Sequence, residues 1–319
     1  MKCLITGAAG FIGSSLSDLL LSQGHDVIGV DCFTDYYQRE IKEANITRAL
    51  ADLRFTFLED DLLAMDVDGL LQGIDWVFHE AAQAGVRASW GTSFDIYVRN
   101  NILVTQKLLE AARNSQIKRL VYASSSSIYG DSPELPLRES ARPQPVSPYG
   151  VTKLAAEHLC YLYHVNYGVP AVSLRYFTVY GPRQRPDMAF NKFIRAALRG
   201  EEIVVHGDGE QTRDFTFISD ICNANLLAAQ AEGAVGRAFN VGGGSRVTVN
   251  HVLDVLSALA GEKVKVRHIE DQKGDVRHTL SDTTAAHELL GYYTKVPVEE
   301  GLAREFAWLK PLTPNPYHK

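Results

Sequence analysis

Short apolar runs alternate with helix-like segments over the first 180 residues, and this alternation is the strongest constraint on the fold. The run Leu120-Val121-Tyr122-Ala123 is apolar almost throughout, as strands buried on both faces are. Between the first two runs, Ile12, Leu16 and Leu19 form one apolar helical face. The pattern predicts an α/β fold with a Rossmann-like, doubly wound parallel sheet. The expected strands lie at about 2–6, 26–30, 54–58, 75–79, 118–123 and 170–175.

The last third of the chain has a different pattern, which predicts a second domain. Glycine-containing turns at 207–209 and 242–244 separate shorter periodic pieces. We therefore expect one domain over residues 1–180 and a smaller, mixed α/β domain over 181–319. The apolar segment 238–241 is expected to return to the first domain as one more core strand.

Composition excludes several classes of function. The 319 residues carry a net charge of −6, which argues against nucleic acid as a partner. No run of ~18 apolar residues is present, so no membrane span is expected. The N-terminus opens directly with a strand-like run and no secretory leader, which favours a cytoplasmic protein. The spacing of the cysteines fits neither a zinc site nor a dithiol motif, so we expect no metal and reduced thiols at Cys3, Cys32, Cys160 and Cys222.

Three glycines at three-residue spacing follow the first apolar run. In such a strand–turn–helix context, one glycine makes the tight turn, one lets the backbone approach a pyrophosphate, and one lets helix and strand pack closely. The N-terminus of the following helix supplies amide donors to the phosphates. We therefore predict that a dinucleotide contacts Gly7, Gly10 and Gly13, together with Phe11 and Ile12.

Residues after the next three strands extend this predicted dinucleotide site. Asp31 ends the second run, where a carboxylate can accept hydrogen bonds from the adenosine ribose and would repel a 2′-phosphate. No basic residue follows before Arg39, so NAD is favoured over NADP. Four residues after the third and fourth runs are expected near the cofactor, because an acid can meet the adenine amino group and small alanines leave room for the ribose and nicotinamide. They are Asp61, Leu62, Ala81 and Ala82.

A tyrosine and a lysine at helical spacing are the candidate acid–base pair. Ser147 can cap a helix that begins at Pro148, so Tyr149 and Lys153 share one helical face. The Lys153 ammonium and a nicotinamide cation are expected to lower the pKa of the Tyr149 phenol from its usual value of roughly 10. Tyr149 would then act as a base toward a substrate hydroxyl, and Lys153 could also bind the nicotinamide ribose. The serine run within 123–130 follows the fifth strand, at the sheet edge where ligands bind.

These features, together with segment 174–177, resemble the extended short-chain dehydrogenase/reductase family, and specifically its nucleotide-sugar epimerases. The resemblance implies an NAD-binding domain over 1–180, a nucleotide-sugar-binding domain over 181–319 and a UDP-sugar substrate. It makes Ser125 the catalytic serine, and Ser125 and Ser126 substrate contacts. It also implies that Asn101 braces the central helix and that Asn101, Tyr149, Lys153 and Tyr176 belong to the cofactor site. Family members commonly form homodimers through two helices, here at about 99–114 and 149–166.

Three segments in the chain indicate the substrate. Segment 207–216 resembles the family segment whose arginine grips the diphosphate, which assigns that role to Arg213, with Arg277 as a second candidate. Segments 176–190 and 85–90 resemble those of UDP-glucuronate 4-epimerases. A sugar carboxylate needs a compensating charge, which Arg185 can supply, with Thr178 as a further donor and Arg87 as another possibility. The implied reaction is NAD-dependent 4-epimerisation of UDP-glucuronic acid to UDP-galacturonic acid through a 4-keto intermediate.

Four alternatives stay open on the sequence. Epimerisation of UDP-glucose and UDP-galactose is one, although those enzymes usually carry asparagine where Thr178 stands. Decarboxylation of UDP-glucuronate is disfavoured because the related decarboxylases usually have glutamate where Ser127 stands. Sugar 4,6-dehydratases usually have an Asp-Glu pair in place of Ser126 and Ser127. A non-catalytic NAD-binding sensor would typically have lost the Tyr/Lys pair or the serine.

Overall fold

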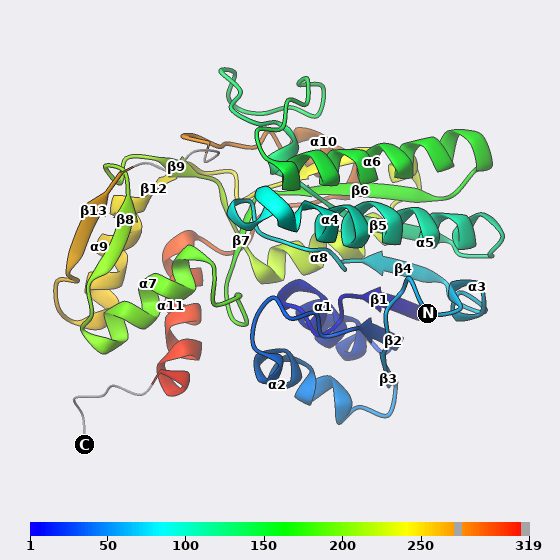
Figure 1. Ribbon diagram of the computed structural model, residues 1–319, viewed down its shortest axis with the longest axis horizontal. Coiled ribbons are helices and arrows are strands. Elements are labelled where there is room, and N and C mark those ends of the chain that lie inside the picture. The colour runs from blue at the N-terminus through cyan, green and yellow to red at the C-terminus, as the bar shows by residue number, and fades with distance from the viewer. Residues whose placement is uncertain (271–275, 314–319) are drawn as a thin grey trace.

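The computed structural model describes residues 1–270 and 276–313, and a seven-stranded parallel sheet forms its centre (Figure 1). The strand order is β11-β6-β5-β4-β1-β2-β3. Each of the six predicted apolar runs forms one of these strands, so the predicted Rossmann-like sheet is confirmed. The strands are β1 (Lys2–Thr6), β2 (Asp26–Asp31), β3 (Phe55–Glu59), β4 (Trp76–His79), β5 (Arg119–Ser125), β6 (Ala171–Tyr176) and β11 (Ala238–Val241).

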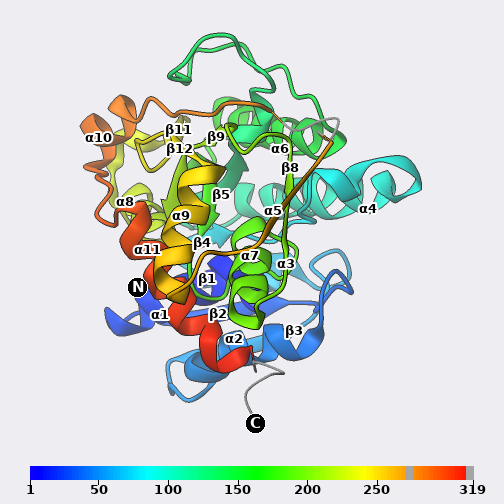
Figure 2. The same cartoon turned by 90° about the vertical axis from the view of Figure 1, so that its left-hand side faces the viewer.

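Helices cover both faces of this sheet (Figures 1 and 2). On each face, the helices and the sheet bury a separate apolar cluster, as the layered architecture requires. One face carries α1 (Phe11–Ser22), α2 (Arg39–Leu50) and α8 (Ile218–Gln230), and the other carries α3 (Val67–Leu70), α5 (Val104–Arg113) and α6 (Pro148–Tyr167).

Helix α6 and the segment before α5 carry residues to the carboxyl edge of the sheet. The Ser147 side chain caps α6 by accepting a hydrogen bond from the Gly150 amide at 3.1 Å, and Pro148 is the first helical residue, as predicted. Before α5, the chain forms α4 (Phe94–Tyr97) and then a π-helical turn, η3 (Val98–Leu103). Short 3-10 turns are η1 (Arg87–Ser89), η2 (Gly91–Ser93) and η4 (Ser126–Ile128).

The C-terminal part lies beside the carboxyl ends of β6 and β11, because both strands lead directly into it (Figure 1). It contains three two-stranded sheets, which pair β7 with β10, β9 with β12, and β8 with β13. The strands are β7 (Thr178–Tyr180), β8 (Ile203–His206), β9 (Thr212–Arg213), β10 (Phe215–Phe217), β12 (Val247–Thr248) and β13 (Val266–Ile269). The helices of this part are α7 (Ala189–Arg199), α9 (Val249–Ala260), α11 (Val298–Leu309) and η6 (Lys310–Leu312). Two other late segments, η5 (Glu232–Ala234) and α10 (Thr284–Leu290), lie instead beside β11 and α8 of the large sheet.

Several segments cross the boundary that the sequence suggested at residue 180. β7 ends at that residue, on the N-terminal side of the expected boundary, yet it pairs with β10 of the C-terminal part. Helix α8 and strand β11 follow it, yet they pack on the large sheet, where β11 pairs with β6. The chain therefore passes between the two parts more than once.

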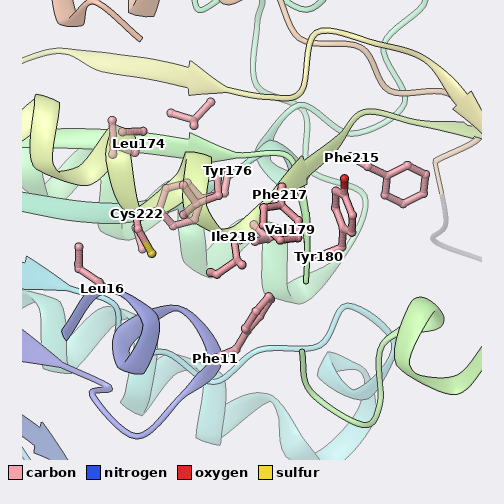
Figure 3. Packing of buried hydrophobic residues seen from close by; sticks show 14 of the residues in the cluster. Phe11, Leu16, Leu174, Tyr176, Val179, Tyr180, Phe215, Phe217, Ile218 and Cys222 are labelled. Carbon is pink, nitrogen blue, oxygen red and sulfur yellow. The ribbon is translucent and has the colours of Figure 1, made fainter. Parts of the chain in front are cut away.

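The two parts also share a hydrophobic core (Figure 3). Phe11 of α1 lies on the side of that helix that faces Ile218 of α8. Further out, the ring of Tyr180 meets the rings of Phe215 and Phe217 at centroid distances of 6.1 and 5.4 Å. This continuous packing fixes the C-terminal side chains relative to the large sheet. Within the described ranges, no helix combines the length and the apolar character needed to cross a membrane.

Candidate active site

A cleft opens where β1 and β4 lie side by side and the chain connections leave on opposite faces of the sheet. It is lined by all of the predicted cofactor-binding residues except Asn101. These are Gly7, Gly10, Phe11, Ile12, Gly13, Asp31, Asp61, Leu62, Ala81, Ala82, Tyr149, Lys153 and Tyr176.

The glycine turn forms the floor of this cleft. Gly7 has a φ of +69°, and its carbonyl accepts a hydrogen bond from the Gly10 amide at 3.0 Å. A Cβ on Gly7 would lie 2.8 Å from the Ala81 backbone, and one on Gly13 would lie 2.2 Å from the Gly7 carbonyl oxygen. Gly10 is the N-cap of α1 and provides no capping side chain. The turn therefore fits a pyrophosphate, which needs close backbone approach and uncapped amides.

The adenosine end of the cleft is acidic, but it also contains a lysine. Asp31 accepts hydrogen bonds from the amides of Ala9 and Phe33, and burial raises the pKa of its carboxyl. Asp61 lies nearby and pairs with Arg99 at 3.2 Å. The buried Lys42 lines the cleft, donates to the Thr34 carbonyl at 2.6 Å and attracts Asp31.

The charge of Lys42 was missed in the sequence argument for NAD, which considered Arg39 as the next basic residue. Arg39 is bound by Glu43 and Glu59 and does not line the described cleft. A lysine on the helix after β2 could have been noticed from its place three residues beyond Arg39, but only the tertiary fold shows that it turns inward.

Tyr149 and Ser125 meet at the carboxyl ends of the central strands. Tyr149 lies in the first turn of α6, and its side chain forms a hydrogen bond with Ser125 at the end of β5. Burial raises the pKa of the Tyr149 phenol, while the Ser125 hydrogen bond and the positive charge of Arg185 oppose this rise.

The prediction that the Lys153 ammonium lowers the pKa of Tyr149 is wrong, because another side chain supplies the positive charge near the phenol. The Lys153 ammonium lies over the ring of Tyr122, 4.5 Å from its centroid, and Arg185 is the cation that favours the Tyr149 phenolate. Burial lowers the pKa of Lys153 to about 8, and the negative charge of Glu80 is the main influence against this.

The other serines of the run have different environments. Ser124 donates a 2.6 Å hydrogen bond to Glu157, which forms a buried ion pair with Arg175 at 2.6 Å. Ser127 donates its amide to the Ser125 hydroxyl, and Ser126 begins η4. Ser125 is therefore the serine of this run that the structure places on Tyr149.

Asn101 braces the site from behind. Its amide oxygen accepts from the Gln83 amide at 2.7 Å, and its nitrogen donates to the Gln83 carbonyl and to the Thr152 hydroxyl. It is buried in η3 and does not line the described cleft. The bracing role expected from the family pattern agrees with this geometry, and a direct contact of Asn101 with the cofactor stays a prediction.

Among the predicted substrate residues, Arg185 alone lines this cleft as the structure describes it. Its Nε and Nη2 atoms donate to the two carboxylate oxygens of Asp187 at 3.0 and 3.1 Å. Tyr36, from the loop after β2, donates to the same carboxylate at 3.2 Å. The cation is therefore held at the junction of the two parts of the protein.

The remaining predicted substrate residues form other groups. Arg213 lies in β9 and donates to the carbonyl of Arg277, so these two arginines are neighbours. Thr178 is paired in the β7–β10 ladder with Phe215, two positions after Arg213. Arg87, in η1, does not line the described cleft. Residues 274 and 275, which precede Arg277 in its motif, lie outside the described residues.

Comparison with known proteins identifies the family. Residues 3–242 match the family model described as the NAD dependent epimerase/dehydratase family. The chain belongs to this family. Its glycine turn, serine run, Tyr149 and Lys153 all lie within the matched segment, and the resemblance to the extended short-chain dehydrogenase/reductases is thereby confirmed.

Individual relatives match over almost the whole chain. A protein of Bacillus subtilis (strain 168) described as uncharacterized UDP-glucose epimerase YtcB is 42% identical, with 98% of this chain and 99% of that protein covered. The UDP-glucuronate 4-epimerase of Thermodesulfobacterium geofontis is 39% identical, with 96% and 95% covered. The crystal structure of UDP-glucuronic acid 4-epimerase from Bacillus cereus, in complex with UDP-glucuronic acid and NAD, aligns with a TM-score of 0.95. It is 42% identical and covers 98% of this chain and 100% of that one.

Proposed function

We propose that this chain interconverts UDP-glucuronic acid and UDP-galacturonic acid by NAD-dependent inversion at C4 of the sugar. The observation that carries the proposal is the position of Arg185, which extends from the C-terminal part into the cleft that holds Tyr149. A cation at this place matches a sugar that carries a carboxylate, because an unpaired charge in a water-poor site is costly. Similarity to the solved UDP-glucuronic acid 4-epimerase supports the same substrate.

Each catalytic side chain has a distinct task in this reaction. NAD, when bound, supplies the chemistry of accepting a hydride from C4 and returning it. Tyr149 removes the O4 proton as the hydride leaves, which gives a 4-keto sugar, and it later returns the proton. Ser125, which is hydrogen-bonded to Tyr149, holds O4 of the sugar. Arg213 and Arg277 bind the diphosphate, about which the sugar turns to present its other face.

Arg185 has a second task that follows from the chemistry of the intermediate. A 4-keto uronic acid is a β-keto acid and can lose CO2. An arginine that binds the carboxylate, assisted by Thr178, would hold it away from the geometry that favours cleavage of the carbon–carbon bond. The ion pair with Asp187 orients the guanidinium for this purpose while leaving the Nη1 donors available.

UDP-glucose is the alternative substrate that one observation favours. Because Asp187 already neutralises Arg185, a neutral sugar would not leave a buried charge unpaired. Decarboxylation and 4,6-elimination lack comparable support, since Ser126 and Ser127 stand where the related enzymes carry acids.

A product analysis separates these possibilities. The purified enzyme is incubated with UDP-glucuronic acid or with UDP-glucose, and the nucleotide sugars are resolved by chromatography while NADH is followed by absorbance. We expect UDP-galacturonic acid without net NADH, and a loss of at least about 100-fold in kcat for Tyr149→Phe, because it lacks the proton-transfer group. Accumulation of NADH would indicate a dehydrogenase. A UDP-pentose product would indicate a decarboxylase, and the absence of turnover would indicate a non-catalytic sensor.

We also propose that the enzyme is a cytoplasmic homodimer. Apolar side chains that are about half exposed, one in η3 just before α5 and four on α6, support a shared helical interface. The four thiols are free, which suits a reducing compartment. Light scattering after size exclusion should give twice the mass of 35.3 kDa. The residues that would be covered are Leu103, Val151, Tyr161, Leu162 and Val165.

A further inference from the structure

Glu80 occupies a position in the active-site cleft for which the proposed mechanism has no task. It follows β4 directly and lines the cleft with Tyr149 and Lys153. Its carboxylate accepts a hydrogen bond from the Tyr176 hydroxyl at 2.8 Å, and that hydroxyl accepts one from the Asn225 amide at 2.7 Å. Strand β6 and helix α8 therefore both fix the carboxylate in the wall of the cleft.

Lys153 lies in the same cleft and needs a counter-charge. Its side chain is 2% exposed, and its ammonium rests on the face of the Tyr122 ring. Within residues 1–270 and 276–313, no protein group accepts a hydrogen bond from this ammonium. Its N–H donors are thus left to the cleft, and the cation depends on nearby negative charge to offset its lost hydration.

Three groups near Lys153 could supply that charge, and two of them do not. Glu157 is already neutralised by its ion pair with Arg175. Burial raises the pKa of the Cys160 thiol to about 12, so it stays uncharged. Glu80 is the remaining acid, and it exerts the largest attraction on Lys153.

We propose that Glu80 is a positioning residue for the cofactor, which as a carboxylate keeps Lys153 charged so that its N–H donors can hold the nicotinamide ribose. The inference rests on the proposed role of Lys153 in binding NAD. It adds to the site a second acid that acts through Lys153 and touches neither the sugar nor the proton being transferred.

The sign of the effect follows from burial. Burial raises the pKa of Glu80 to about 7 and lowers that of Lys153 to about 8. Below pH 7, Glu80 takes up a proton, but Lys153 is charged in any case. Above pH 7, the Glu80 carboxylate opposes the loss of the Lys153 proton. Its charge therefore supports NAD binding mainly on the alkaline side of the pH range. The other titratable groups that face Glu80 or Lys153 are uncharged there because burial shifts their pKa values: Tyr122, Tyr176, Cys222 and His79.

The test is the variant Glu80→Gln, which keeps the shape and removes the charge. Loss of this one nearby negative charge should lower the pKa of Lys153 by about one unit. The decline of kcat/KM on the alkaline side should then begin about one pH unit lower than in the wild type. Affinity of the cofactor-free protein for NAD, measured by calorimetry, should match the wild type within about twofold at pH 6 and be about five- to tenfold weaker at pH 8.5, since one unit of pKa is a factor of ten. Glu80→Asp should restore the wild-type limb.

Glu59→Gln is the matched control. Glu59 likewise lies at the carboxyl end of a strand of the large sheet, the edge strand β3, but it pairs with Arg39 at the surface. Its replacement should therefore leave the NAD profile unchanged. Only folded enzyme turns over substrate, so the pH at which kcat/KM falls on the alkaline side is a property of the folded molecules. It can therefore be measured even if the Glu80 variant folds poorly. A loss that is equal at pH 6 and pH 8.5, or an unmoved limb, would overturn the proposal. The NAD measurement needs no sugar, so a wrong substrate assignment would leave this result standing.

Discussion

Replacement of Glu157 by glutamine tests how the catalytic helix is held on the sheet. Glu157 lies on α6, two turns after Tyr149, and Arg175 lies on β6. Arg175 donates to both carboxylate oxygens, the shortest contact being 2.6 Å, and Ser124 donates to one of them. Both charged side chains are 8% exposed, so the pair is largely shielded from water.

The magnitude follows from this burial. Removal of one partner from a buried ion pair costs about 3–5 kcal/mol, because the other charge is left uncompensated. Glutamine keeps one acceptor oxygen for Arg175, which places the expected loss near the lower end, at about 3 kcal/mol. At about 2 °C per kcal/mol for a chain of this size, the melting temperature should fall by about 6 °C.

The assay is thermal unfolding of the two proteins by circular dichroism, with Glu202→Gln as the matched control. Glu202 pairs with Arg267 at the same 2.6 Å separation, but these side chains are 48% and 59% exposed. Exposed pairs contribute up to about 1 kcal/mol, so the control should shift melting by no more than about 2 °C. Equal shifts for the two variants would refute the argument from burial.

Two further predictions concern the cofactor and the substrate. Gly13→Ala should weaken NAD binding at least about tenfold, because its Cβ would meet the Gly7 carbonyl oxygen at 2.2 Å and displace the turn; unchanged affinity in a calorimetric measurement would contradict the close-packing account. Arg185→Gln should lower kcat/KM for UDP-glucuronic acid about 30-fold or more, a loss of about 2–5 kcal/mol in transition-state stabilisation. UDP-glucose turnover should fall less, because it loses only the effect of Arg185 on Tyr149, and NAD affinity should change little. Parallel kinetics on the two sugars decide the point, and equal losses would count against the carboxylate role.

The sequence predicted the sheet well because its four middle strands, β1, β4, β5 and β6, are buried on both faces. Such strands are apolar almost throughout and therefore conspicuous, as in the run at 120–123. The glycine turn was equally accessible, since its requirements are local: a positive φ at Gly7 and close packing at Gly13. The pairing of β7 with β10 could not be predicted from the sequence, because the two strands are very short and far apart in the chain.

The electrostatics of the site were harder to predict for the same reason. Spacing within α6 correctly placed Tyr149 and Lys153 on one helix, but it did not show that the ammonium turns onto Tyr122. The cation that acts on Tyr149 is Arg185, which arrives from another segment. Glu80 and Lys42 were likewise missed as charged members of the cleft, because a single polar residue after a strand or on a helix has no signature of its own.

The π-helical turn η3 makes the length of its segment as important as its composition. A turn of this type contains an extra residue compared with an α-helix, so the side chains before and after it point in independently set directions. Here it lets Asn101 hold Gln83 and Thr152 while Leu108 and Leu109 of α5 pack beneath the sheet. Removing a single residue would rotate one group relative to the other by about 100°. A substitution in this stretch should therefore disturb the site less than the deletion of a residue.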